Sequence, residues 1–338
     1  MARFLFSKRI AIEQYNKLRA LGLSIAYSVK TNPAFVEGLE QETEMEFTVH
    51  NIRNLSLIKE PSRVWFFPQA WKSKEIDVLI SKGVNKFVLD NENDLKVLLG
   101  FLKTHAVKIS LLLRMKLREH TIFTGRYFVF GMAFETVNEW IPKLRKLPAI
   151  EKLGVHFHRK SQNVSEWRLA DELKTSLTKE TFDAIDIIDI GGGFPADYKN
   201  TSDAIMVRVE QDIKELKAWA KGKSIIAEPG RFISAPAGKL EVEIINVYEH
   251  NIIVDTSVYS GAMDTLVVPI KLRLEGELEK GQAYTIKGIS ACSMDIFRYK
   301  VFLKQPKVGD KLVFLNAGAY NYYTDFCNIE KPEVVFVD

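Results

Sequence analysis

The sequence has little cysteine, no long apolar run and no strong excess of either charge. Its two cysteines, Cys292 and Cys327, form neither a disulfide framework nor a pair with metal-ligand spacing. No apolar run reaches the roughly 18 residues of a membrane span, and the opening residues MARFLFSKRI lack the apolar core of a signal peptide. We therefore expect a cytoplasmic protein that is neither secreted nor embedded in a membrane, and we expect no metal site.

The charges are nearly balanced, with 47 lysines and arginines, 43 acidic residues and a net charge of +4. Basic residues are mixed with acidic ones along the chain, and this mixing disfavours a nucleic-acid-binding surface. Hydrophobic residues make up 46% of the 338 positions, which is ordinary for a globular protein. Because the chain exceeds the usual size of one core, we expect one large and one smaller domain.

Short apolar runs rich in β-forming residues alternate with longer helical patterns from about residue 23 onward. Eight runs are candidate strands: residues 23–29, 47–49, 64–67, 86–89, 108–113, 153–157, 185–190 and 224–227. The helical patterns between them cover residues 72–82, 91–104, 134–147, 164–179 and 202–221. This alternation predicts an α/β protein with a parallel (β/α)8, TIM-like barrel.

After residue 227 the pattern changes to strand-like segments without long helices. We expect strands at residues 239–248, 251–254, 265–274, 283–289, 311–314 and 333–337, joined by one at residues 3–6. This pattern predicts a mainly β domain. We place the barrel at residues 10–235 and the β domain at residues 236–338 together with residues 1–9.

Polar residues at the carboxyl ends of the barrel strands are the candidate functional groups, because active sites of such barrels form there. The first strand ends in Tyr-Ser-Val-Lys30-Thr-Asn-Pro. A desolvated lysine at this place has a lowered pKa and forms a Schiff base with an aldehyde cofactor. The alternative interpretation of Lys30 is an ordinary surface lysine.

The sixth and seventh strands end in histidine and glycine motifs. The alternation of a strand places His156 and His158 on one face, and one of these imidazoles would stack on a planar ring unless both are structural. The N–H groups of Gly191, Gly192 and Gly193 suit a phosphate, although a glycine turn without a ligand has the same sequence.

The eighth strand runs directly into Glu228-Pro-Gly230-Arg231. Gly230 and Arg231 would complete a phosphate site from the loops after strands seven and eight. If the cofactor is pyridoxal 5'-phosphate (PLP), the Glu228 carboxylate would keep the pyridine nitrogen protonated, which makes the ring a strong electron sink. The alternative role for this motif is an interdomain salt bridge.

In order and spacing these motifs resemble the ornithine/diaminopimelate/arginine decarboxylase family, the fold-type III PLP enzymes with an alanine-racemase-like barrel, over nearly the whole chain. The resemblance implies that Lys30 carries PLP and that His158 stacks on its ring. The other implied cofactor contacts are Arg114, Ser161, Gly191, Gly192, Gly193, Glu228, Gly230, Arg231 and Tyr320. The implied activity is loss of the α-carboxylate as CO2 from ornithine, lysine, arginine, diaminopimelate or a specialised amino acid with a distal polar or charged group.

The segment implied to bind substrate departs from the family pattern of Gly-Pro-x-Cys followed by an acid. Ala291 stands in the place of the proton-donating cysteine and Cys292 in that of the acid, while Asp295 closes the segment in register. Cys292 is therefore a proton donor brought in by a remodelled loop, a bystander to another acid, or a buried inert thiol. Cys292, Asp295 and Tyr320 are the candidate substrate ligands.

Further substitutions leave the substrate open. Thr48 replaces an acid found after the strand-two phenylalanine, Val268 replaces an arginine before Pro269, and Val129 replaces a lysine before Phe-Gly. The resemblance also implies a homodimer in which the Asp295 loop comes from the neighbouring subunit. Two other interpretations are an amino-acid racemase of the same fold, and a catalytically silent, PLP-binding regulatory homologue.

Overall fold

The computed structural model describes residues 1–117, 130–163, 165–201, 205–321 and 328–338. The chain divides into two compact units. The barrel unit comprises Asn16–Phe194 and Ile205–Pro229, and the β unit comprises Met1–Tyr15, Pro195–Ala204 and Gly230–Asp338. The sequence-based limits, residues 10–235 against 236–338 with 1–9, stay a prediction of the domain boundaries.

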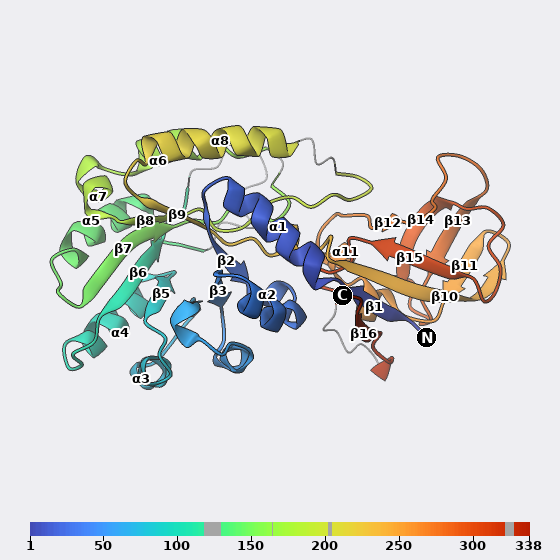
Figure 1. Cartoon of the computed structure of the whole chain (residues 1–338), viewed down its shortest axis with the longest axis horizontal. Helices are drawn as coiled ribbons and strands as arrows, with labels where there is room; N and C mark the ends of the chain where they lie inside the picture. The colour runs from blue at the N-terminus through green and yellow to red at the C-terminus, as the bar shows by residue number, and fades with distance from the viewer. Residues whose placement is uncertain (118–129, 164, 202–204, 322–327) are drawn as a thin grey trace. The chain divides into compact units, whose positions relative to one another are not determined.

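Eight parallel strands close into a barrel in chain order, from β2 to β9, and this confirms the predicted fold (Figure 1). The strands close where β9 pairs with β2, with Ser24 opposite Ile226 and Ile25 opposite Ala227. All eight candidate strands are present, with small shifts at their ends. Their bounds are Ser24–Ser28 (β2), Glu46–Val49 (β3), Val64–Phe66 (β4), Lys86–Leu89 (β5), Ile109–Arg114 (β6), Ile150–His156 (β7), Ile187–Asp189 (β8) and Ser224–Ala227 (β9).

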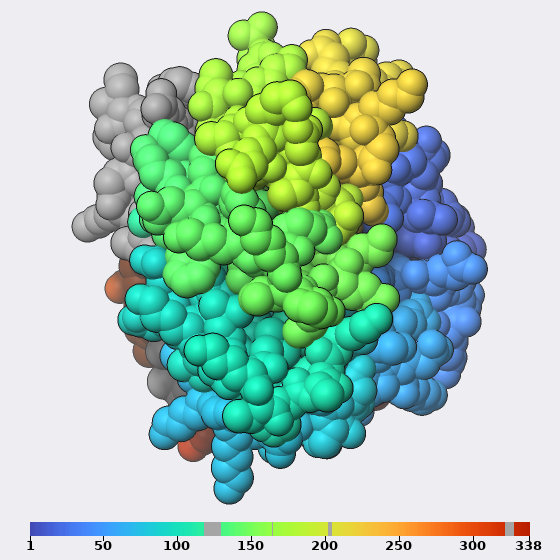
Figure 2. All heavy atoms as spheres, turned by 90° about the vertical axis from the view of Figure 1, so that its left-hand side faces the viewer, coloured from blue at the N-terminus to red at the C-terminus, as the bar shows by residue number. Residues whose placement is uncertain are grey.

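The helices between these strands form much of the surface turned to the viewer in Figure 2, from cyan to yellow. The helix predicted at residues 164–179 is shorter, spanning Leu169–Ser176, and a separate helix begins at Lys179, where the Thr178 side chain accepts a hydrogen bond from the Thr181 N–H. No helix in the described ranges is long and apolar enough to cross a membrane. The helices are α1 (Lys8–Ala20), α2 (Val36–Glu42), α3 (Ser73–Ser81), α4 (Glu92–Leu102), α5 (Phe134–Leu144), α6 (Leu169–Ser176), α7 (Lys179–Ala184) and α8 (Met206–Trp219).

Helix α4 shows why the predicted periodicity holds. The Asn91 side chain caps its first turn by accepting a hydrogen bond from the Asp94 N–H, and Leu95, Leu98 and Phe101 recur at a spacing of three and are buried. The barrel strands also contribute to a buried hydrophobic cluster. Its members are Ala26, Trp65, Phe67, Val88, Leu112, Ile187 and Ile226. The strand ends are therefore held on a packed core.

The β unit contains the remaining strands. They lie in the order β12-β15-β10-β11-β13-β14, and β1 pairs with both β10 and β16, which confirms the strand predicted at residues 3–6. The bounds are Arg3–Phe6 (β1), Gly238–Tyr248 (β10), Asn251–Val254 (β11), Arg273–Leu274 (β12), Ala283–Lys287 (β13), Ile296–Phe302 (β14), Lys311–Leu315 (β15) and Glu333–Phe336 (β16).

Two expectations for the β unit were wrong. Residues 265–274 do not form one strand: helix α11 (Asp264–Val267) occupies the start, and only β12 pairs at the end. The Asp264 N–H donates to the Asn321 side chain, a distant contact that the apolar run does not reveal. Strand β14 was missed because its pairing with β13 shifts register, so exposed and buried residues do not alternate along it. Two other short helices are α9 (Arg231–Ser234) and α10 (Val258–Gly261).

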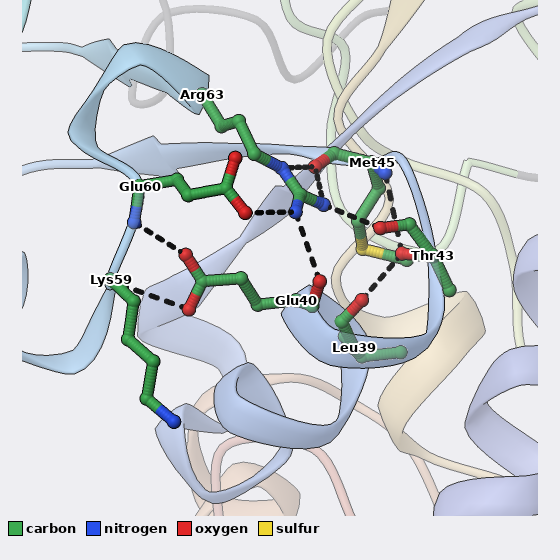
Figure 3. Close-up of polar contacts among 7 residues, drawn as sticks. All are labelled: Leu39, Glu40, Thr43, Met45, Lys59, Glu60 and Arg63. Atoms are coloured by element: carbon green, nitrogen blue, oxygen red, sulfur yellow. Dashed lines mark hydrogen bonds and ion pairs between the residues drawn. The ribbon is translucent and has the colours of Figure 1, made fainter.

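A polar cluster fastens α2 to the chain that leads into β4 (Figure 3). The Glu40 carboxylate accepts the N–H groups of Lys59 and Glu60 at 3.0 and 2.8 Å. The Arg63 guanidinium donates to the carbonyls of Glu40 and Met45, each at 2.9 Å from one of its nitrogens. Because Glu40 is only 5% exposed, its carboxylate satisfies backbone donors that water reaches poorly.

Replacing Glu40 by alanine should lower the free energy of unfolding by about 1–3 kcal/mol, because two partly buried N–H groups lose their acceptor. Glu37→Ala, on the same helix, removes an exposed ion pair with Lys59 and should cost less than about 0.5 kcal/mol. Urea unfolding of both variants measures the difference. Equal losses would contradict the anchoring role.

Candidate active site

The carboxyl end of every barrel strand delivers a side chain or a glycine to one rim, and we call these residues the barrel rim. Parallel strands in a closed barrel all end on the same side, so residues far apart in sequence meet there. The barrel rim consists of Lys30, Thr48, His50, Phe67, Asp90, Arg114, His156, His158, Gly191, Gly192, Gly193 and Glu228.

Lys30 follows β2 in a short turn whose neighbours are fixed. Val29 and Thr31 are buried, and the Tyr27 hydroxyl donates to the Asn32 carbonyl at 2.9 Å. The Lys30 side chain itself is exposed at the barrel rim and has no hydrogen-bond or ion-pair partner among the described residues. The surrounding protein still desolvates its amine, which lowers the pKa of Lys30 against the opposing charge of Glu228. Lys30 is thus a reachable amine that deprotonates more easily than a surface lysine.

The Glu228 carboxylate is held at both oxygens. The Thr48 hydroxyl donates to Oε1 at 2.7 Å, and His156 Nε2 lies 3.2 Å from Oε2. Burial alone would raise the pKa of Glu228, but the His156 ring and the hydrogen bonds outweigh burial and lower it to about 2. Burial lowers the pKa of His156, so we assign this ring as a neutral donor through Nε2. Glu228 is therefore a fixed negative charge at neutral pH.

Asp189 lies behind this pair. Burial, with Glu228 adding to it, raises the pKa of Asp189 well above its usual range, so we expect a protonated Asp189 beside an ionised Glu228. One ligand atom each from His156, Asp189 and Glu228 lie within 4.8 Å of one another, as metal ligands would. A hydrogen bond between His156 Nε2 and Glu228 Oε2 already joins two of these three side chains.

His158 presents an exposed ring just beyond β7. The strand ends at His156, which is fully buried, so the alternation that was expected to place both histidines on one face does not continue to His158. The Gly192 N–H donates to His158 Nδ1 at 3.1 Å, which fixes the ring orientation. Although one side of the ring is exposed, desolvation by the surrounding protein, followed by the charge of Arg114, lowers the pKa of His158 to about 3. A neutral, oriented imidazole of this kind can stack on a flat ligand.

The three glycines after β8 are needed for close packing. Gly191 and Gly193 have positive φ angles, and a Cβ atom at either would lie 2.5 or 2.9 Å from a backbone carbonyl oxygen. The N–H of Gly191 donates to Asp189 and that of Gly192 to His158, so within the described residues only the Gly193 N–H of the three has no partner. The expected phosphate contacts from Gly191 and Gly192 would therefore require these bonds to change.

The loop after β7, which contains Ser161, is fastened to the glycine run. The Asn163 N–H donates to the Gly193 carbonyl at 2.9 Å, and the Trp167 indole donates to the Asn163 carbonyl at 2.8 Å. Ser161 is exposed in this loop. Its predicted phosphate contact stays a prediction.

Arg114 ends β6 and is half-buried. Its Nη1 donates to Asp90 at 3.1 Å, and its guanidinium lies over the rings of Phe67 and Phe130 at 5.4 and 5.0 Å. Burial lowers the pKa of Arg114, and Asp90 opposes that shift. Asp90 also accepts the Gly131 N–H at 3.0 Å, so its carboxylate is engaged from two sides.

Sequence reasoning assigned no role to four members of the barrel rim: His50, Phe67, Asp90 and Thr48. His50 lies 5.5 Å from the Phe67 ring, and Phe67 in turn contacts the His156 ring edge-on at 5.2 Å. Each of the four lies at or just beyond the end of a predicted strand. Collecting all side chains at those ends would have found them without any motif.

The β unit holds the other predicted cofactor residues, Gly230, Arg231 and Tyr320. Arg231 is buried and forms a bidentate ion pair with Asp264. Its Nη1 also donates to the Tyr198 hydroxyl at 3.0 Å. The Tyr320 ring lies 5.2 Å from the guanidinium. The phosphate roles of Gly230, Arg231 and Tyr320 stay predictions.

Cys292 and Asp295 occupy different environments. Cys292 is exposed rather than buried, with its Sγ 3.1 Å from the Tyr259 hydroxyl. Asp295 is 1% exposed, and its carboxylate accepts the N–H groups of Val258 and Ser290 and the Ser290 hydroxyl at 2.6–3.0 Å. Asp295 is thus a loop anchor, and its geometry gives no support to the expected contact with substrate.

Comparisons with known proteins agree on one family. Residues 15–235 match the family model described as pyridoxal-dependent decarboxylase, pyridoxal binding domain. The chain is 26% identical to a diaminopimelate decarboxylase of Zymomonas mobilis, over 88% of this chain and 76% of the relative. It is 22% identical to the 2-[(L-alanin-3-ylcarbamoyl)methyl]-2-hydroxybutanedioate decarboxylase of Staphylococcus aureus, over 90% and 82%.

A solved structure confirms the fold over the full length. The lysine/ornithine decarboxylase of Vibrio vulnificus, crystallised with cadaverine, superposes with a TM-score of 0.85 at 21% identity, covering 100% of this chain and 95% of the other.

His50 provides a pH-dependent test of the barrel rim. Burial, followed by the charge of Lys30, lowers the pKa of His50 from 6.5 to about 4. Between these values the unfolded chain binds a proton that the folded chain does not. Stability is therefore lost as the pH falls, by at most about 1.4 kcal/mol per pH unit.

His50→Asn removes this contribution. From pH 6.5 to pH 4.5 we expect the wild type to lose about 2 kcal/mol more unfolding free energy than the variant in urea titrations. Gln211→Ala, an exposed and uncharged substitution on α8, should keep the wild-type slope. Equal slopes for wild type and His50→Asn would contradict the proposed environment.

Proposed function

The chain belongs to the pyridoxal-dependent decarboxylases, and on that premise we propose that its barrel rim holds PLP and directs removal of the α-carboxylate from an amino acid with a distal polar or charged group. The observation that carries the proposal is the pairing of a reachable amine, Lys30, with a fixed negative charge, Glu228, on one rim. We also propose that the protein is cytoplasmic and acts as a homodimer.

The barrel rim supplies groups that fit this cofactor. Lys30 would hold PLP covalently, the exposed His158 ring would lie against its flat face, and Glu228 would contact its ring nitrogen. A buried, ionised carboxylate whose hydrogen-bond donors are neutral is complementary to a protonated pyridine nitrogen. We propose further contacts from Arg114, Ser161, Gly193, Gly230, Arg231 and Tyr320.

Bound PLP supplies an electron sink for the electrons left on the substrate when CO2 departs. The protein supplies orientation and proton control. The hydrogen bonds from Thr48 and His156 hold the Glu228 carboxylate ionised. That negative charge would keep an adjacent ring nitrogen protonated. His158 cannot rotate without losing the Gly192 hydrogen bond. The lowered pKa of Lys30 increases the fraction of neutral, nucleophilic amine, the form that would hold the cofactor.

The proton that replaces CO2 needs a donor, and Cys292 is our candidate. Its thiol is exposed, and the hydrogen bond with Tyr259 lowers the pKa of Cys292. In a homodimer this loop would serve the neighbouring subunit. Two relatives by name act on diaminopimelate and on a substituted hydroxybutanedioate, so a specialised substrate is consistent with the family.

Lys30→Ala should abolish covalent cofactor capture. In the wild type, borohydride reduction of protein saturated with PLP should leave one phosphopyridoxyl group, which mass spectrometry should locate on the peptide containing Lys30. Lys103→Ala, at an exposed lysine beyond α4, should retain the group. Capture at another lysine, or equal capture in both variants, would rule out the assigned attachment point.

A panel of L- and D-amino acids tests the reaction and the proton donor together. We expect CO2 release from one substrate class without racemisation, and Cys292→Ala should lower turnover by at least about tenfold. Unchanged turnover in this variant would remove Cys292 as the donor. Racemisation without CO2, or a PLP-bound protein inert to the whole panel, would instead support the racemase or the regulatory homologue.

A further inference from the structure

We propose that a pocket beside His158 binds a distal carboxylate of the substrate, so that the substrate is an acidic amino acid rather than a diamino acid. The pocket, here called the cationic pocket, is lined by Arg114, Met115, Lys116, Leu117, Phe130, His158 and Arg159. The proposal rests on the proposed function, because His158 joins the cationic pocket to the expected cofactor ring.

Local backbone geometry directs two cations into the cationic pocket. Residues Arg114 to Lys116 continue the line of β6 as extended chain, with Met115 bridged to Met132. The Lys116 N–H donates to the Met132 carbonyl, and the Met132 N–H donates to the Arg114 carbonyl, both at 2.9 Å. Alternate residues of an extended chain point to the same side, so Arg114 and Lys116 share a face while Met115 is buried.

The charges in the cationic pocket are unbalanced. Among the residues that the structure describes, its lining contains three cationic side chains and no acidic one. Arg159 is neutralised by ion pairs with Glu172 and Glu166. Arg114 donates to Asp90 through Nη1 alone, and half-buried Lys116 has no ion-pair partner among the described residues. An incoming carboxylate would therefore find Lys116 and the remaining Arg114 N–H groups available.

The barrel rim has no unpaired carboxylate to neutralise a distal ammonium group. Asp90 is already ion-paired with Arg114 and also accepts the Gly131 N–H, both at Oδ1. Asp189 is fully buried, and its pKa is raised by burial and by Glu228, while the Glu228 carboxylate is assigned to the cofactor ring nitrogen. A substrate ammonium group entering here would meet the positive charge of Arg114 and Lys116, which Asp90 offsets only in part, and this charge disfavours binding.

The carboxylate in the cationic pocket is the one that stays on the product. Nearby positive charge stabilises an ionised carboxylate and opposes its loss as CO2, so a reacting carboxylate would be held back there. The product would then carry an amine at the former α-carbon and a distal carboxylate. Compounds of this kind are simple probes of the cationic pocket.

Matched product analogues test the proposal by binding rather than by turnover. The pairs δ-aminovalerate with cadaverine and γ-aminobutyrate with putrescine differ only in whether the distal group is a carboxylate or an ammonium. Titration calorimetry with the PLP-loaded protein should show tighter binding of the carboxylate member of at least one pair by about tenfold or more. The same titrations with PLP-free protein should keep the direction of the preference.

Variants of Lys116 give the matched controls. Lys116→Ala should lose the preference and Lys116→Glu should invert it, while Lys116→Arg and the exposed-site control Lys103→Ala should keep it. PLP content, measured by absorbance before each titration, should be unchanged in all four.

Tighter diamine binding in wild type, or a preference that Lys116→Glu leaves intact, would overturn the proposal. Loss of PLP from Lys116→Ala would assign the cationic pocket to the cofactor and overturn it as well. A protein that never binds PLP contradicts the proposed function instead, and the titrations of PLP-free protein then still decide whether the cationic pocket prefers carboxylates.

Discussion

The buried negative charge of Glu228 is the constraint on which the barrel rim depends. Removing an ionised carboxylate from water costs several kcal/mol unless hydrogen bonds compensate, and here Thr48 and His156 provide them from two other strands. Burial and the charge of Glu228 together raise the pKa of Asp189. Phe67 packs on the His156 ring and under the Arg114 guanidinium, so the apolar contacts of the barrel rim support its charges.

The carboxyl end of the barrel presents a negative charge at one place and positive charges at another. On the side of Glu228 the protein presents a fixed negative charge, which suits a protonated ring nitrogen. On the side of Arg114 and Lys116 it presents positive charge that Asp90 offsets only in part. A molecule held between them would be oriented by charge, with its acidic end toward the cationic pocket, and specificity would follow from both attraction and repulsion.

Much of this arrangement could be predicted from the sequence, because strand ends are local signals. The eight apolar runs and the motifs at Lys30 and Glu228 located the barrel rim correctly. Contacts between distant segments could not be predicted. The sequence identified Thr48 only as a residue that replaces an acid of the family pattern, and nothing local indicated its hydrogen bond to Glu228. Asp295 was expected at the substrate because its register matched, whereas its burial and backbone partners depend on the tertiary fold.

The most direct measurement of the central claim is the protonation state of the cofactor ring nitrogen. Nitrogen-15 NMR of the protein loaded with ring-labelled PLP reports that state independently of turnover. The account predicts a protonated nitrogen in wild type at neutral pH and an unprotonated one in Glu228→Gln, which is similar in size but uncharged. An unprotonated nitrogen in wild type, or the same signal in both proteins, would contradict the role of the Glu228 charge.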